Sequence, residues 1–138
     1  MKETIQKAIS ALAEIAELRY VADDAGQGDM AVTPGTQPFA CPAALVAADS
    51  GLPAEHRTKD TIRERVLIGV RLYDAPGTVA NFKAPGKHAE ASLRIYDMRD
   101  AVIKKLEAGG FRYSGYSRIR RDDGMRELLV SFEVAITI

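Results

Sequence analysis

Apolar side chains occupy every second position at the end of the chain. The apolar positions of this run are Leu128, Val130, Phe132, Val134, Ile136 and Ile138. Successive side chains of a β-strand point to opposite faces, so this spacing predicts one long strand over residues 126–138 with a strongly apolar face. Such a face must be covered, either by helices of the same chain or by another molecule.

The rest of the chain supplies partners for this strand. The alternation recurs at 60–73, which predicts a second long strand. Apolar residues recur at helical spacing in 2–17 and in 87–108, which predicts two amphipathic helices. Shorter apolar runs predict three further strands, at 18–22, 39–48 and 111–120. Residues 1–138 are therefore expected to form one α+β domain in the order α-β-β-β-α-β-β, with two helices on a mostly antiparallel sheet of about five strands.

Local sequence signals place the breaks between these elements. Pro42 has no N–H to donate, so its strand either lies at a sheet edge or begins near Ala43. Gly69, inside the second long strand, indicates a bulge, a bend or a close backbone approach. Polar segments rich in turn residues predict loops at 23–38, 49–59 and 74–86 and a hairpin turn at 122–124.

The predicted length of the last strand is large for a domain of this size. At about 3.3 Å per residue, the strand is about 43 Å long. A compact domain of 138 residues has a radius of gyration of about 14 Å and a diameter of about 37 Å. The strand is therefore expected either to bend sharply or to project at one end and meet another subunit.

Composition narrows the functional classes. Nineteen basic residues balance nineteen acidic ones, so no global field favours nucleic acid or a membrane. No apolar stretch is long enough for a transmembrane helix, and no signal peptide is recognised. Cys41 is the only cysteine, which excludes an internal disulfide and favours a reducing, cytoplasmic setting.

The chemistry-bearing residues form no known catalytic or metal-binding motif. Cys41, His56 and His88 lie in different segments without the spacing of a zinc site. No serine has the sequence context of an activated nucleophile. We therefore expect no catalytic residue, no metal and no cofactor, and a protein that is not an enzyme. A small ligand-binding or enzymatic domain stays as an alternative that would require a deep pocket with convergent polar groups.

Arginines are the side chains most suited to contacting a partner. Several surround the final hairpin, with Tyr113 and Tyr116 between them. This pattern is compatible with phosphate contacts and base stacking, so a nucleic-acid-binding module is the alternative function. Neutral net charge and the lack of a nucleic-acid-binding signature favour a subunit interface or a solvated face instead. The predicted interface residues are Arg63, Arg65, Arg71, Arg118, Arg120, Arg121 and Arg126.

The order of elements resembles that of the phage tail-terminator (tail-completion, minor tail) proteins of long-tailed phages and prophages. The resemblance rests on the N-terminal helix and on the strand Pro38-Phe-Ala-Cys-Pro-Ala-Ala-Leu-Val after a polar loop. It also rests on the strand Thr61-Ile-Arg-Glu-Arg-Val-Leu-Ile-Gly-Val and on the helix containing Leu93-Arg-Ile-Tyr-Asp-Met-Arg-Asp-Ala-Val with its closing hairpin. The resemblance covers nearly the whole chain. It is a resemblance of architecture, because the family shares few invariant motifs.

The resemblance implies a structural protein of the virion tail that is assembled in the bacterial host cytoplasm. Such a subunit forms a ring, typically of six copies, that caps the tail tube and stops its polymerisation. The partners implied are other copies of the chain, the tail-tube protein and the head–tail connector protein. The composition predicts no membrane partner and disfavours nucleic acid, which stays as the alternative. The loop at 23–38 is long and rich in Gly and Pro, which leaves open the surface that meets the tube.

Overall fold

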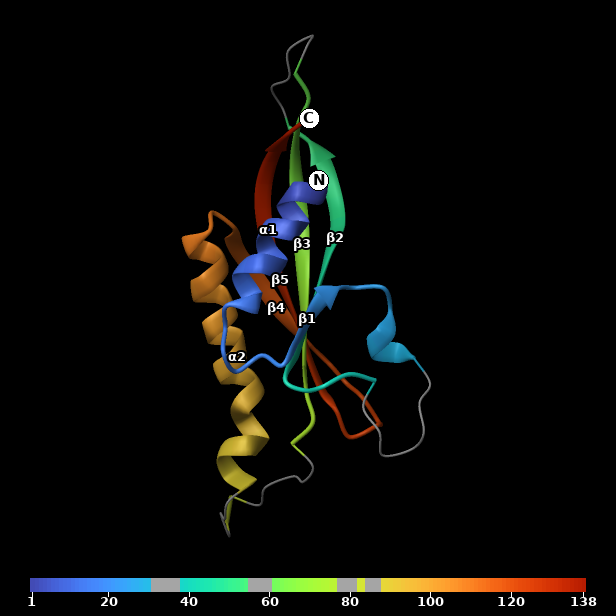
Figure 1. Cartoon of the computed structure of the whole chain (residues 1–138), viewed down its shortest axis with the longest axis vertical. Coiled ribbons are helices and arrows are strands. Elements are labelled where there is room, and N and C mark those ends of the chain that lie inside the picture. The colour runs from blue at the N-terminus through green and yellow to red at the C-terminus, as the bar shows by residue number, and fades with distance from the viewer. Residues whose placement is uncertain (31–37, 55–60, 77–81, 84–87) are drawn as a thin grey trace.

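The computed structural model describes residues 1–30, 38–54, 61–76, 82–83 and 88–138. Within these residues the chain forms two α-helices, one short 3-10 helix and five strands (Figure 1). In chain order the elements are α1 (Lys2–Ala13), β1 (Tyr20–Asp23), η1 (Gln27–Asp29), β2 (Ala43–Pro53), β3 (Arg63–Asp74), α2 (His88–Ala108), β4 (Arg112–Ile119) and β5 (Arg126–Thr137). The predicted α+β fold and the order of its elements are confirmed.

All five strands form one sheet in the order β1-β2-β3-β5-β4. Only the pair β1 and β2 is parallel, and the other pairs are antiparallel. The two long strands, β3 and β5, pair along their whole length, from Arg63 opposite Thr137 to Asp74 opposite Arg126. β5 therefore lies inside the sheet, and the free edges belong to β1 and β4.

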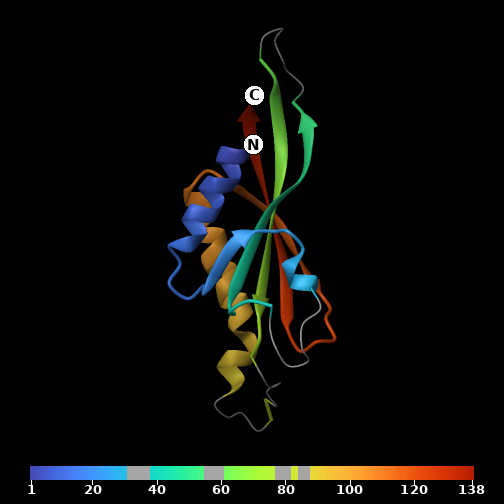
Figure 2. The same cartoon turned by 45° about the vertical axis from the view of Figure 1, so that its right-hand side comes forward.

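Both helices pack on the same face of the sheet (Figure 2). α2 lies over β3, β4 and β5, whereas α1 lies over β1 and β2 and against α2. The even-numbered residues of the long strands point toward the helices. Their buried side chains form the main core together with residues of the helices, of β2 and of the segments that follow each helix: Ala8, Leu12, Ile15, Ala44, Val46, Val66, Ile68, Val70, Leu72, Ile95, Met98, Val102, Leu106, Phe111, Leu128, Val130 and Phe132.

The opposite face of the sheet carries a second, smaller core near one end. The ring of Phe39, from the segment before β2, stacks on Tyr20 with centroids 5.1 Å apart and meets Tyr73 edge-on at 5.2 Å. Ala43, Leu45 and Met125 are buried in the same cluster. The segment around η1 lies on this side of the sheet, away from the helices (Figure 2). At one end, this face is therefore covered by the segment before β2 and the segment around η1, and not by a long helix.

β2 differs most from its prediction. It begins at Ala43, directly after the cis peptide bond between Cys41 and Pro42, and it lies between two strands, so the edge position predicted as one alternative is wrong. It continues to Pro53, through a stretch predicted as loop, because a register shift at Asp49 lets it stay paired with β3. The Asp49 carboxylate lies over Gly69, where an added Cβ would collide with it. The group that approaches Gly69 is thus a side chain and not the predicted backbone, and the bulge lies on β2 at Asp49 and not at Gly69.

The other boundaries differ less. α1 ends at Ala13, four residues earlier than predicted, because the Glu14 and Ile15 N–H groups donate to carbonyls three residues back, at Ala11 and Leu12. Asp23, predicted to begin a loop, ends β1 instead, and the same predicted loop contains η1. The parts of the predicted loops at 31–37, 55–59, 77–81 and 84–86 lie outside the described residues, as do position 60 of the second predicted long strand and position 87 of the second predicted helix.

Candidate functional site

One end of the sheet projects beyond the helices. In both views the ends of β2, β3 and β5 extend past the N-terminal end of α1 (Figures 1 and 2). Backbone pairing continues to this end, because the Ile138 N–H donates to the Ile62 carbonyl at 2.8 Å and the Ala54 N–H donates to the Arg63 carbonyl at 2.9 Å. The last strand is long for this domain, and its end therefore projects beyond the helices.

The projecting end carries exposed apolar side chains. Ile138 is 67% exposed, Leu52 is 63% exposed and Ile62 is 47% exposed. The N-terminus lies beside these strand ends in both views, and the Met1 side chain is also exposed. We call Met1, Leu52, Ile62 and Ile138 the strand-end patch. Ile62 and Ile138 lie on the helix face of the sheet, whereas Leu52 shares the opposite face with Arg65, so the patch surrounds the tip of the sheet. Large apolar side chains exposed at the end of a sheet are typical of an interaction surface.

Two of the predicted interface arginines flank the strand-end patch. Arg63 and Arg65 are exposed on β3, and the alternation of the strand directs both away from the helices. Arg65 lies opposite Leu52 in the β2–β3 register. Neither arginine forms an ion pair with another described residue. This end of the sheet therefore combines apolar side chains with two positive charges.

Two other predicted arginines belong to a buried ion-pair network at the other end of the sheet. The Glu127 side chain is 2% exposed. It accepts from Arg71 Nη1 at 2.6 Å and from Arg121 Nη1 at 2.7 Å. Arg71 also pairs with Asp24 at 3.3 Å. These contacts connect β3 and β5 to the end of β1, so Arg71 is a structural residue rather than a free contact.

Arg121 makes the most contacts of this network. Its side chain is 10% exposed, pairs with Asp123 at 2.6 Å, and donates to the Gly28 carbonyl at 2.6 Å. Its guanidinium lies over the Tyr73 ring, 5.4 Å from the centroid. The hydrogen bond to Asp123 raises the pKa of Arg121, and the same bond lowers the pKa of the Asp123 carboxyl. Arg121 thus connects the final hairpin to the segment around η1.

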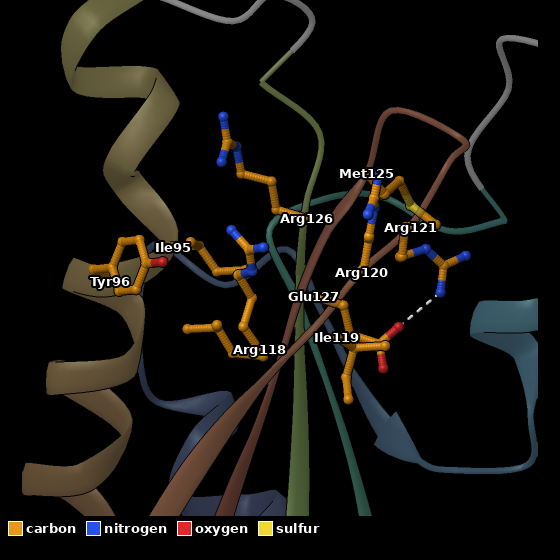
Figure 3. A pocket seen from close by; sticks show the side chains of 10 residues that line it. Ile95, Tyr96, Arg118, Ile119, Arg120, Arg121, Met125, Arg126 and Glu127 are labelled. Atoms are coloured by element: carbon orange, nitrogen blue, oxygen red, sulfur yellow. Dashed lines mark hydrogen bonds and ion pairs between the residues drawn. The ribbon is translucent and has the colours of Figure 1, made fainter.

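The last three predicted arginines line a pocket between α2 and the β4–β5 hairpin (Figure 3). The alternation of the strands directs Arg118 of β4 and Arg126 of β5 toward the helix side of the hairpin, and Arg120 directly follows the end of β4. Arg126 Nη2 donates to Ser92 Oγ of α2 at 3.1 Å. The cavity has a volume of about 160 Å³. We call it the arginine pocket, and it is lined by Ile95, Tyr96, Arg118, Ile119, Arg120, Arg121, Met125, Arg126, Glu127 and Leu128.

The two tyrosines near these arginines are already engaged. Tyr113 packs on Phe132 with ring centroids 6.0 Å apart. Tyr116 is exposed, but the Arg99 guanidinium lies over its ring at 4.7 Å from the centroid. Neither tyrosine ring is therefore free to stack on a base of a nucleic acid.

Among the described residues, no group of three His, Cys, Asp or Glu side chains is placed to hold a metal ion. His56 lies outside the described residues, and His88 is the first residue of α2. Burial raises the pKa of the Cys41 thiol to about 11, so the reactive thiolate is scarce at neutral pH.

Sequence reasoning placed the seven arginines in one class, whereas the structure separates them into three groups. It also missed Leu52 and Glu127. Leu52 follows a Gly and precedes a Pro, which is a turn signal. Glu127 lies on the odd-numbered face of the last strand, and its partner Arg71 is known only once β3 and β5 are in register.

Within the described residues, no helix is both long and apolar enough to cross a membrane. No protein-family model matches the sequence, and no curated protein is significantly similar to it.

Proposed function

We propose that this chain is a structural subunit of a ring that caps the tail tube of a long-tailed phage or prophage, stops tube polymerisation and joins the tube to the head connector. The strand-end patch carries the proposal, because its apolar side chains lie on a projecting sheet end where a neighbouring subunit can cover them. The α+β architecture is the one that the resemblance implies.

The patch is too small to hold two free subunits together by itself. Full burial of a large apolar side chain stabilises by about 1.5–3 kcal/mol. Leu52, Ile62 and Ile138 are each about half to two-thirds exposed, so covering them contributes about 3–5 kcal/mol in total. Association costs about 4–15 kcal/mol in lost freedom of motion. We therefore expect the isolated chain to associate weakly and to form stable rings on a template such as the tail tube.

A closed ring also needs a second, different surface on each subunit. β4 is suited to this role, because it is an edge strand of eight residues whose outer backbone groups have no partner strand in the described chain. An edge of this kind pairs readily with a strand from another molecule. Contact between the strand-end patch of one subunit and the β4 side of the next would propagate around a ring.

The proposal is tested by mutating the strand-end patch. We expect Ile62→Asp combined with Ile138→Asp to abolish assembly, because each carboxylate would have to be buried without a partner. Leu93→Asp is the matched control, since Leu93 is equally exposed but lies on α2. Sedimentation velocity and negative-stain microscopy, with and without the tail-tube protein, would compare the variants after circular dichroism has shown that each is folded.

Rings formed by the wild type and the control, but not by the double variant, would support the proposal. It would be refuted by a wild type that stays monomeric at high concentration with tail-tube protein present. Unimpaired assembly of the double variant would exclude the patch as the interface. The gene neighbourhood is an independent check, because a terminator gene is expected beside tail-tube and connector genes.

Nucleic-acid binding is the second candidate, and one observation favours it. Arg118, Arg120 and Arg126 form no ion pair with a described residue. Binding that weakens steeply with salt would indicate this function.

A further inference from the structure

The geometry of the arginine pocket points to a binding site for an acidic peptide segment of a partner protein. We propose that the segment inserts an apolar side chain into the pocket and pairs its flanking carboxylates with Arg118, Arg120 and Arg126. The pocket lies where Asp74 and Arg126 pair, at the opposite end of the sheet from Arg63 and Thr137. The inference is therefore independent of ring formation through the strand-end patch.

The first argument is local charge. Five other arginines of the described chain have carboxylate partners: Arg71, Arg94, Arg99, Arg112 and Arg121. The three arginines of the pocket have none there. The one carboxylate that lines the pocket, that of Glu127, is already paired with Arg71 and Arg121. Three positive charges thus gather without local compensation in a chain of zero net charge, and carboxylates are the groups that arginine binds most strongly.

The second argument is the apolar lining. The buried side chains of Ile95 and Leu128 line the pocket from the helix side of the sheet. Met125, which belongs to the second core, and Ile119 also line it. The volume of about 160 Å³ exceeds several times the space of one liquid water molecule, about 30 Å³. The cavity therefore has room for one large side chain. A cavity lined by both apolar and positively charged side chains fits an apolar residue flanked by acidic ones.

The third argument is rigidity. The Asp74 carboxylate accepts from Arg94 Nη2 at 2.7 Å and from Arg94 Nε at 3.0 Å, which holds α2 against the end of β3. Ser92 holds Arg126 in place, and Glu127 is fixed from the other face of the sheet. Walls that are already fixed lose little freedom when a ligand binds.

The same observations favour a peptide over nucleic acid. Nucleic-acid binding without sequence preference uses a groove of positive charge with free aromatic rings on which bases stack. Here the cations line a concave cavity together with apolar side chains, and the nearby rings of Tyr113 and Tyr116 are occupied by Phe132 and Arg99.

Fluorescence anisotropy would test the proposal with a short labelled peptide that alternates glutamate and leucine. The controls are the same peptide with glutamine in place of glutamate and a labelled single-stranded DNA. We expect the full-length protein to bind the glutamate peptide, with affinity that falls as salt is added. Arg118→Gln combined with Arg126→Gln should weaken this binding at least about tenfold, since hydrogen bonds to charged groups are lost. Arg63→Gln combined with Arg65→Gln is the matched control and should leave it unchanged.

Four results would overturn the proposal: no binding of the glutamate peptide, equal binding of the glutamine peptide, equal losses in the two double variants, or tighter binding of the DNA through the pocket arginines. Thermal unfolding would first show that the variants are folded. Sedimentation with tail-tube protein would separate this proposal from ring formation, because the single variant Arg126→Gln changes no residue of β4 and should assemble like the wild type.

Discussion

Glu127→Gln tests the buried network that joins the final hairpin to the rest of the sheet. Glutamine keeps the shape of the side chain, but it removes the negative charge between two guanidinium groups. Its amide oxygen can accept from Arg71 or from Arg121, while its NH₂ group faces the other donor. The structure therefore predicts a loss of stability without a change of volume.

The size of the loss follows from burial. Removing one partner of a fully buried ion pair costs about 3–5 kcal/mol. Here the Arg71 side chain is 35% exposed and keeps Asp24, and Arg121 keeps Asp123 and the Gly28 carbonyl. We therefore expect a smaller cost of about 2–3 kcal/mol. For a domain of this size this corresponds to a decrease in Tm of about 6–12 °C.

Glu133→Gln is the matched control for this experiment. Glu133 lies on the same strand and face and pairs with Arg112, whose side chain is largely exposed. An exposed pair of this kind contributes about 0–1 kcal/mol. Urea unfolding followed by circular dichroism would measure both variants against the wild type. Equal midpoints for Glu127→Gln and Glu133→Gln would refute the reasoning, because burial would then make no difference.

Three further predictions concern the same end of the sheet. Gly28→Ala should lower the free energy of unfolding by about 1–3 kcal/mol in urea titrations, because the new Cβ would collide with the Tyr73 ring. Asp123 has a pKa below its unfolded value of about 3.9 because it accepts a hydrogen bond from Arg121. Its stabilising effect is present above that value and is lost as pH falls through the folded-state pKa, so Asp123→Asn should lessen the loss of stability in acid titrations. Cys41, with a pKa of about 11, should react with iodoacetamide more slowly at pH 8 in the folded protein than in urea, as followed by mass spectrometry.

The sequence was sufficient to predict the main core but not the surfaces. Alternation in the last strand placed Leu128, Val130 and Phe132 on the side where Ile95 and Met98 meet them. This prediction succeeded because both periodicities are local properties of the chain.

The end of β2 could not be predicted in the same way. Ser50, Gly51 and Pro53 favour a turn, yet the strand continues to Pro53, because the register shift at Asp49 preserves its pairing with β3. A neighbouring strand overrode the local preference. The separation of the arginines into groups could be predicted in part, because alternation places Arg121 and Arg118 on opposite faces. The partner of Arg71 could not be predicted, because it lies 56 positions away in the sequence.

β5 shows why an apolar pattern does not by itself distinguish a core from an interface. Phe132 and Ile138 belong to the same alternation, yet Phe132 is fully buried and Ile138 is mostly exposed. The difference arises from what covers each position: α2 lies over the middle of the strand, and the helices end before its tip. Only a comparison of strand length with domain size anticipates this change. A strand too long for its own domain therefore predicts a surface for another subunit, and the strand-end variants test whether that surface is used.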